Sequence, residues 1–272
     1  MKLNLPEYFD WNHPERYVLL IGIHPEWFSF AVYDLTEECT SFYQQWGDSQ
    51  EDVFSCFKEY FFEEPFFQQA FQKVYLLNYY SEFTYVPSLL FDEKYKENTM
   101  NALFSEREKG RVLKQLLKTR ELIILHKIPE EIYDFFHRSF VKAEFVHYSS
   151  GILSYFQDQK NLASASQFVL NFREKELDIF CFREGNFVLG NRYDCQDVND
   201  ALYYTLFTWK QLKQDQLTDY LYLAGNEKQK KEAEEKLKFY IQNVVSTSVF
   251  PEQSSSGLNV PLEFLALNRC EI

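Results

Sequence analysis

Two hairpin turns and one strand-to-helix junction carry the polar residues whose types and spacing could support chemistry. They are the turns His24-Pro25-Glu26 and Asn171-Phe172-Arg173 and the junction Gly225-Asn226. Arg173 and the nearby Lys175 could attract an anion, although charged residues on a hairpin turn more often only contact solvent. The Gly-Asn pair is more simply an ordinary loop followed by a helix N-cap. Anion binding is therefore the chemistry to test at these positions.

Motifs for catalysis or for metal binding are missing from the sequence. Residues 185–192 have the two-glycine spacing of a phosphate loop, but they lack the Lys and the Ser or Thr of that motif. There is no Gly-x-Ser-x-Gly elbow. Metal-ligand spacing is absent among the histidines and cysteines, which are His13, His24, His126, His137, His147, Cys39, Cys56, Cys181, Cys195 and Cys270. The sequence therefore predicts neither catalytic residues nor a metal site.

The chain is acidic, with 28 basic and 41 acidic side chains among 272 residues and a net charge of −13. This charge repels nucleic acid and anionic membrane surfaces. The first residues contain no apolar signal core. The longest apolar run near them, residues 18–23, is far shorter than the ~20 residues that span a bilayer. The five cysteines, an odd number, indicate reduced thiols. We expect a cytoplasmic protein with no nucleic-acid partner and no membrane insertion.

The elements that position the first turn are predicted from the pattern of apolar residues. Strands are expected at residues 17–24, 27–34, 41–46, 73–78 and 143–147, with an extended stretch at 83–91. A helix with Ser49 as its N-cap is expected to bury apolar residues between 53 and 61. Further helices are expected at residues 93–104, 129–138 and 149–157. Residues 111–118 and 121–126 are either two strands or a helix followed by a strand.

The second half of the chain repeats this order. Strands are expected at residues 167–172, 177–182, 186–193, 220–223 and 244–250, and helices at 197–211 and 227–241. An apolar segment at 260–267 ends the pattern. Each half thus begins with an antiparallel three-strand meander, followed by a helix, a further strand and a helix. The small, polar stretch 158–166 marks a boundary between domains of residues 1–160 and 161–272.

This shared order resembles the actin-like ATPase fold, in which two related domains face each other across a nucleotide cleft. The segment Leu217-Thr-Asp-Tyr-Leu-Tyr-Leu-Ala-Gly-Asn226 and the helix after it resemble the adenosine motif of that fold. The most similar branch contains pilus-assembly and secretion-scaffold proteins. The whole chain, with its closing Asn268-Arg-Cys-Glu-Ile272, resembles the uncharacterised bacterial domain-of-unknown-function family 3822. The resemblance implies an α/β fold of two ribonuclease H-like lobes, each a mixed sheet flanked by helices.

The resemblance matches the first turn to a phosphate-binding motif that reads Asp-x-Gly in the working ATPases. Here Pro25 has no N–H to donate. Glu26 would repel a polyphosphate by ~4 kcal/mol at ~4 Å and an effective dielectric constant of about 20. His24 does not replace an aspartate toward magnesium, which prefers oxygen ligands. With only 8 glycines, the chain has little backbone that can approach a phosphate closely.

The other two motif positions are changed as well. At the second turn, Asn171 keeps a hydrogen-bonding group but not the charge of the family's aspartate. At the adenosine motif, Gly225 is kept and Asn226 stands in the second glycine position. The resemblance therefore implies a degenerate cofactor site, whose positions are His24, Glu26, Asn171, Arg173, Gly225 and Asn226. We expect no cofactor, and ATP with magnesium is disfavoured.

Three functions follow as hypotheses. We expect a non-catalytic actin-like scaffold that binds an unknown protein partner. The first alternative is a divergent ATPase or small-molecule kinase, and the second is a sensor in which a nucleotide or small anion closes the two lobes. Residues 61–67, which include four phenylalanines, are either an exposed partner site or two helix ends that fill the core. We favour the core for this segment.

Overall fold

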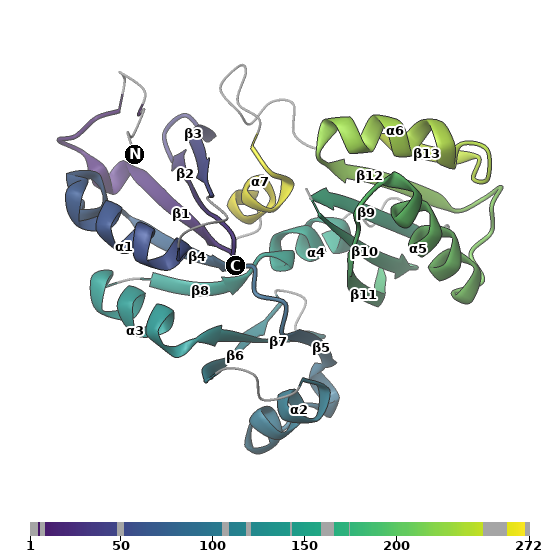
Figure 1. The fold of residues 1–272 in the computed structure, drawn as a ribbon, viewed down its shortest axis with the longest axis horizontal. Helices are drawn as coiled ribbons and strands as arrows, with labels where there is room; N and C mark the ends of the chain where they lie inside the picture. The colour runs from purple at the N-terminus through teal and green to yellow at the C-terminus, as the bar shows by residue number, and fades with distance from the viewer. Residues whose placement is uncertain are drawn as a thin grey trace. The chain divides into compact units, whose positions relative to one another are not determined.

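A computed structural model describes most of the chain (Figure 1). The described residues are 5, 9–47, 52–104, 109–117, 121–141, 143–158, 166–173, 175–246 and 260–269. The chain folds into two compact units, unit 1 from residues 1–151 together with 252–272, and unit 2 from residues 152–251. The predicted boundary between residues 160 and 161 lies outside the described residues. The last helix of the chain belongs to unit 1, although it follows unit 2 in the sequence.

The main sheet of unit 1 has the strand order β3-β2-β1-β4-β8. Its strands are β1 (Tyr17–Ile23), β2 (Phe28–Asp34), β3 (Cys39–Trp46), β4 (Lys73–Asn78) and β8 (Ala143–His147). β1, β2 and β3 form an antiparallel meander, while β1, β4 and β8 run parallel. Every residue of β1 is buried, as expected for a strand that is covered on both faces. The five strands predicted for this part of the chain are confirmed.

Two helices, α1 (Val53–Glu63) and α3 (Glu130–Ser139), contribute aromatic side chains to the core of the main sheet. Asp52 caps α1, because its carboxylate accepts a hydrogen bond from the Ser55 N–H at 3.1 Å. Ser49, the expected cap, lies outside the described residues. Short 3-10 turns, η1 (Pro14–Arg16) and η2 (Pro65–Gln68), complete this part of unit 1.

The phenylalanine-rich segment 61–67 fills the core. Phe61, Phe66 and Phe67 are buried, whereas Phe62 is 67% exposed. The ring of Phe67 packs edge-on against Phe30 of β2, with ring centroids 5.1 Å apart. The expectation that the ends of two helical segments feed the core at this point is confirmed for three of the four phenylalanines.

Unit 1 also contains a second sheet of three strands, which we call the small sheet. Its strands are β5 (Phe83–Pro87), β6 (Gly110–Leu116) and β7 (Leu122–Pro129), in the order β5-β7-β6. Helix α2 (Lys96–Leu103) contacts β6 and β7, and the 3-10 turns η3 (Ser88–Leu90) and η4 (Glu93–Tyr95) precede it. The predicted helix at 93–104 is confirmed, and the extended stretch ends at Pro87 rather than at residue 91. Of the two interpretations of residues 111–126, the two-strand one is correct.

Unit 2 has a five-stranded sheet with the order β11-β10-β9-β12-β13. Its strands are β9 (Gln167–Arg173), β10 (Glu176–Arg183), β11 (Asn186–Asp194), β12 (Tyr220–Gly225) and β13 (Asn243–Ser246). Helices α5 (Val198–Gln211) and α6 (Glu227–Leu237) pack beside it, and Asp197 caps α5. Helix α6 ends four residues before the predicted position, because residues 238–240 form a turn that buries Ile241. Two further helices are α4 (Ser149–Asp158) and α7 (Leu262–Arg269).

The two five-stranded sheets have the same topology. In each, the first three strands form an antiparallel meander, and the fourth and fifth add in parallel beside the first. The predicted fold class is confirmed: each unit holds a mixed sheet that opens with a meander and is accompanied by helices. Among the described residues, no helix is long and apolar enough to cross a membrane.

Candidate functional site

In unit 1, the candidate site lies at the edge of the main sheet where the parallel strands β1, β4 and β8 end. In open α/β sheets, ligands bind outside the carboxyl ends of the parallel strands. The turn His24-Pro25-Glu26 follows β1 at this edge, Tyr79 follows β4, and Tyr148 follows β8. The backbone N–H of Tyr79 donates to Ile23 O at 3.0 Å, which ties the ends of β1 and β4 together.

The backbone N–H groups of the first turn are used within the turn itself. His24 N–H donates to Trp27 O at 2.9 Å, and Glu26 N–H donates to His24 Nδ1 at 3.0 Å. Pro25 has no N–H. A turn that binds phosphate presents such groups to the ligand. In this turn, the two N–H groups donate instead to the carbonyl of Trp27 and to the imidazole of His24.

Aromatic rings line the same edge. The imidazole of His24 stacks on the indole of Trp27 with ring centroids 4.9 Å apart and an interplanar angle of 9°. Trp27 lies edge-on to Tyr79 at 4.8 Å, and Tyr79 stacks on Tyr148 at 5.0 Å. Tyr79 and Tyr148 are both buried. The four rings therefore form a continuous column over the ends of β1, β4 and β8.

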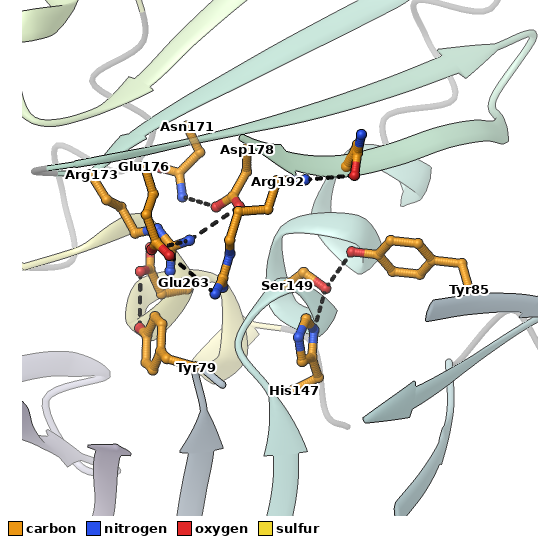
Figure 2. Close-up of polar contacts among 11 residues, drawn as sticks. Tyr79, Tyr85, His147, Ser149, Asn171, Arg173, Glu176, Asp178, Arg192 and Glu263 are labelled. Carbon is orange, nitrogen blue, oxygen red and sulfur yellow. Dashed lines mark hydrogen bonds and ion pairs between the residues drawn. The ribbon is translucent and has the colours of Figure 1, made fainter. Parts of the chain in front are cut away.

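Helix α7, near the C-terminus of the chain, packs against this edge. The hydroxyl of Tyr79 donates to Glu263 Oε1 at 2.9 Å, and both side chains are buried (Figure 2). Phe264 approaches Gly22 so closely that a Cβ on the glycine would lie 3.1 Å from Phe264 Cζ. Gly22 thus allows α7 to pack directly on the end of β1. The sequence pattern indicated only an apolar segment here and did not reveal these contacts.

In unit 2, residues 171–173, which the sequence predicted as the second turn, lie in strand β9 and pair with β10, so this prediction is wrong. Their side chains belong to a cluster of buried ion pairs on the β9–β10–β11 hairpins (Figure 2). Arg173 NH2 lies 2.9 Å from Glu176 Oε2 and 3.1 Å from Asp178 Oδ1. Arg192 reaches the same two carboxylates, each at 3.4 Å. Asn171 Nδ2 donates to Asp178 Oδ2 at 3.3 Å. Asp178 is fully buried, and the side chains of Arg173 and Arg192 are 12% and 7% exposed.

Within the hairpins, two guanidinium groups face two carboxylates. Arg173, which the sequence suggested as an anion ligand, therefore has carboxylate partners on its own hairpin. Lys175 is exposed beside it. Asp178 and Arg192 were not predicted as site residues. The available signal was the hairpin register, which pairs Asp178 with Asn171 across β9 and β10.

Gly225 and Asn226 have structural roles at the end of β12. Gly225 has φ +90°, and a Cβ there would lie 2.0 Å from the carbonyl oxygen of Phe172 on β9. Asn226 N–H donates to that same oxygen at 2.8 Å. The side chain of Asn226 caps α6 by accepting from the N–H groups of Lys228 and Gln229 at 3.1 and 3.2 Å. The glycine allows the close approach of β12 to β9, and the asparagine starts the helix.

These observations place the chain among known proteins. A family model described as "Protein of unknown function (DUF3822)" matches residues 6–244. The chain belongs to this family. It is also similar to the crystal structure of a Bacteroides thetaiotaomicron protein with actin-like ATPase fold and unknown function. That protein is 26% identical with a TM-score of 0.85, and the match covers 96% of this chain and 99% of that one.

A second, more distant structure is similar to this DUF3822 protein in fold. A chain of a PilM–PilN type IV pilus biogenesis complex has a TM-score of 0.59 at 9% identity, over 94% of this chain and 98% of that one. No curated protein matches. The predicted family, the actin-like ATPase fold and the likeness to pilus-assembly proteins are confirmed. The assignment of the six motif residues as a degenerate nucleotide site stays a prediction.

Cysteines and possible metal ligands are spread over the described residues of this DUF3822 protein. No group of three or more His, Cys, Asp or Glu among them could hold a metal ion. Cys39, Cys56, Cys181 and Cys195 are free thiols, and Cys270 lies outside the described residues. Burial raises the pKa of Cys181 to about 12, so its thiol stays protonated at neutral pH.

Proposed function

We propose that this DUF3822 protein is a non-catalytic actin-like scaffold that binds another protein. The observation that carries the proposal is the first turn, in which His24 and Glu26 direct their N–H groups to Trp27 O and His24 Nδ1. A triphosphate at this turn would have to replace both bonds, and Pro25 offers no third donor. The exposed carboxylate of Glu26 would add repulsion.

The second turn supports the same proposal. A phosphate that bound Arg173 would compete with Glu176 and Asp178, which already neutralise it. Removing one partner from a buried ion pair leaves an uncompensated charge and costs about 3–5 kcal/mol. Anion binding at this turn therefore starts with a large penalty.

The PilM–PilN complex supports the choice of a protein as the ligand. There, an actin-like chain of similar size is present in a complex of two named proteins. The same fold is thus compatible with protein binding, and we infer a protein partner for this chain on that analogy. The alternatives, an ATPase or kinase and an anion sensor, both require nucleotide or anion binding at the turns.

Isothermal titration of the full chain with ATP and magnesium tests the proposal, with an actin-like ATPase that binds ATP as positive control. We expect no heat of binding for this chain up to millimolar ATP. Micromolar binding with phosphate release would establish the ATPase alternative. Micromolar binding without turnover would favour the sensor.

A pair of arginine variants shows where any ligand binds. If a nucleotide does bind, Arg173→Ala should abolish binding when the second turn is the site. Arg183→Ala is the matched control, because Arg183 is an exposed arginine at the far end of the same β9–β10 pair and donates to Leu212 O. Loss of nucleotide binding in Arg173→Ala alone would count against the scaffold.

A further inference from the structure

The small sheet of unit 1 has one apolar face and one face on which buried polar side chains lie among apolar ones. Tyr85 and Gln115 both lie opposite Ile124 of β7, and His126 lies two residues further along that strand. Opposite residues and residues two apart in a strand share a face, so Tyr85, Gln115 and His126 point to the same side. The other side packs against α2 through a cluster formed by Met100, Val112, Ile123 and Leu125.

On this second face, each strand of the small sheet has one side chain that forms a hydrogen bond with the end of β4, the end of β8 or the start of α4. We call these contacts the polar seam. They are Tyr85 Oη to Ser149 Oγ at 2.9 Å, His147 N to Gln115 Oε1 at 2.7 Å, and Asn78 Nδ2 to His126 Nδ1 at 2.8 Å. Figure 2 shows the Ser149 hydroxyl between Tyr85 and His147, within hydrogen-bonding distance of both. The seam joins the small sheet to these elements through polar groups that are buried, except for the half-buried Tyr85.

The hydrogen bonds of Asn78 fix His126 as a neutral imidazole. Asn78 Oδ1 accepts from Tyr80 N–H at 3.0 Å, and one Nδ2 proton goes to Lys127 O at 3.0 Å. The second Nδ2 proton therefore faces His126 Nδ1, which must be an acceptor. The ring proton then sits on Nε2. A proton on Nδ1 would face an N–H donor and would break this bond.

The surroundings of His126 do not stabilise an imidazolium. His126 is fully buried, and burial lowers its pKa to about 3. The groups that face it are Asn78 of β4, Phe83 of β5, Leu113 of β6 and His147 of β8, whose ring centroid is 5.5 Å away. In the described part of the chain, no carboxylate contacts either ring nitrogen. The acids beside this sheet pair with its basic residues: Glu82 with Lys127 at 2.9 Å, Glu93 with Lys114 at 2.6 Å, and Glu130 with Arg111.

We propose that the polar seam is a proton-sensitive latch, in which protonation of His126 breaks its bond to Asn78 and releases the small sheet from the ends of β4 and β8. An exposed imidazole has a pKa of about 6.5. Because the closed seam disfavours the proton, the latch is fully stable above that pH. The equilibrium constant for opening rises about tenfold for each pH unit below 6.5, until the pH reaches the pKa of His126 in the closed state. The latch does not depend on whether the turns bind a nucleotide.

Hydrogen exchange of the full chain at pH 7.5 and pH 5.0, corrected for the intrinsic exchange rates, tests the latch. We expect opening of β5, β6 and β7 to increase about 30-fold at pH 5.0, while β9 and β10 of unit 2 serve as internal reference. His126→Phe should remove the pH dependence, because it keeps a buried ring that does not titrate. His137→Gln changes an exposed histidine of α3 and should keep it.

Equal protection of the small sheet at both pH values would overturn the proposal, and so would a pH dependence that persists in His126→Phe. If that variant does not fold, the imidazole resonances of His126 in the natural chain decide. A ring that stays neutral until the amides of the small sheet lose protection supports the latch. A ring that titrates while those amides stay protected rules it out.

Discussion

The imidazole of His24 accepts a hydrogen bond from the backbone N–H of Glu26, with 3.0 Å between Nδ1 and N. A side chain thus occupies a donor that phosphate-binding turns leave available to the ligand. The same ring stacks on Trp27, so His24 contacts both the backbone of Glu26 and the indole that follows it. This contact explains how a turn at the carboxyl end of a parallel strand can satisfy a backbone donor with its own side chain.

His24→Ala tests this role of the imidazole. The variant loses one hydrogen bond and a partly exposed ring stack, and we expect the free energy of unfolding to fall by about 1–2 kcal/mol. Glu26→Ala is the matched control, because it changes an exposed side chain of the same turn and keeps the backbone N–H that donates to His24. Urea-induced unfolding measures both, and equal stability of the two variants would show that the imidazole does not hold the turn.

Gly225→Ala tests the close approach of β12 to β9. The added Cβ would lie 2.0 Å from Phe172 O, a backbone atom, so the strands must separate. We expect a loss of roughly 4 kcal/mol or more, or failure to fold. Gly185→Ala is the control, since Gly185 also has positive φ, +76°, but nothing lies within 4 Å of the added Cβ. That variant should lose only about 1–2 kcal/mol from backbone strain. Thermal unfolding compares the two, and similar losses would contradict the steric argument.

Asp178→Asn tests the buried ion cluster of unit 2. The change removes one of the two hairpin carboxylates that pair with Arg173 and Arg192. We expect a loss of about 3–5 kcal/mol in the free energy of unfolding, because a buried ion cluster loses one of its carboxylates. Glu130→Gln is the control, since the Arg111–Glu130 pair is exposed on both sides and should contribute little. A small effect of Asp178→Asn in urea unfolding would mean that solvent reaches the cluster.

Local sequence patterns predicted most of the strands, because a strand is recognised from apolar residues that follow one another or alternate over a few positions of the chain. β4 has the predicted bounds, residues 73–78, and both meanders were expected. The patterns did not predict the N-cap of α1, which depends on a hydrogen bond between a side chain and the backbone of the first helical turn. The cap of α1 is Asp52, whose position relative to the first turn of the helix is fixed only by the backbone.

The candidate site was predicted less completely because its contacts join residues far apart in the sequence. Tyr79 and Glu263 are 184 residues apart, and neither stands in a motif. His126 and His147 appeared as isolated histidines, although the pairing of β7 with β5 and β6 brings them to one seam. By contrast, the loop at Gly225 and the helix cap at Asn226 could be predicted from the sequence, because both depend only on neighbouring residues.

The bond between Tyr79 and Glu263 provides the last test, since it joins α7 to the end of β4. Tyr79→Phe keeps the ring stack on Tyr148 but removes the donor from a buried carboxylate, which should cost about 1–3 kcal/mol. Tyr43→Phe is the control, because its hydroxyl donates to Gln45 at the surface. A double-mutant cycle with Glu263→Gln, measured by urea unfolding, isolates the pair and should give a coupling energy of about 0.5–3 kcal/mol. Additive effects of the two changes would show that α7 is held by its apolar contacts, such as Phe264 against Gly22, and not by this hydrogen bond.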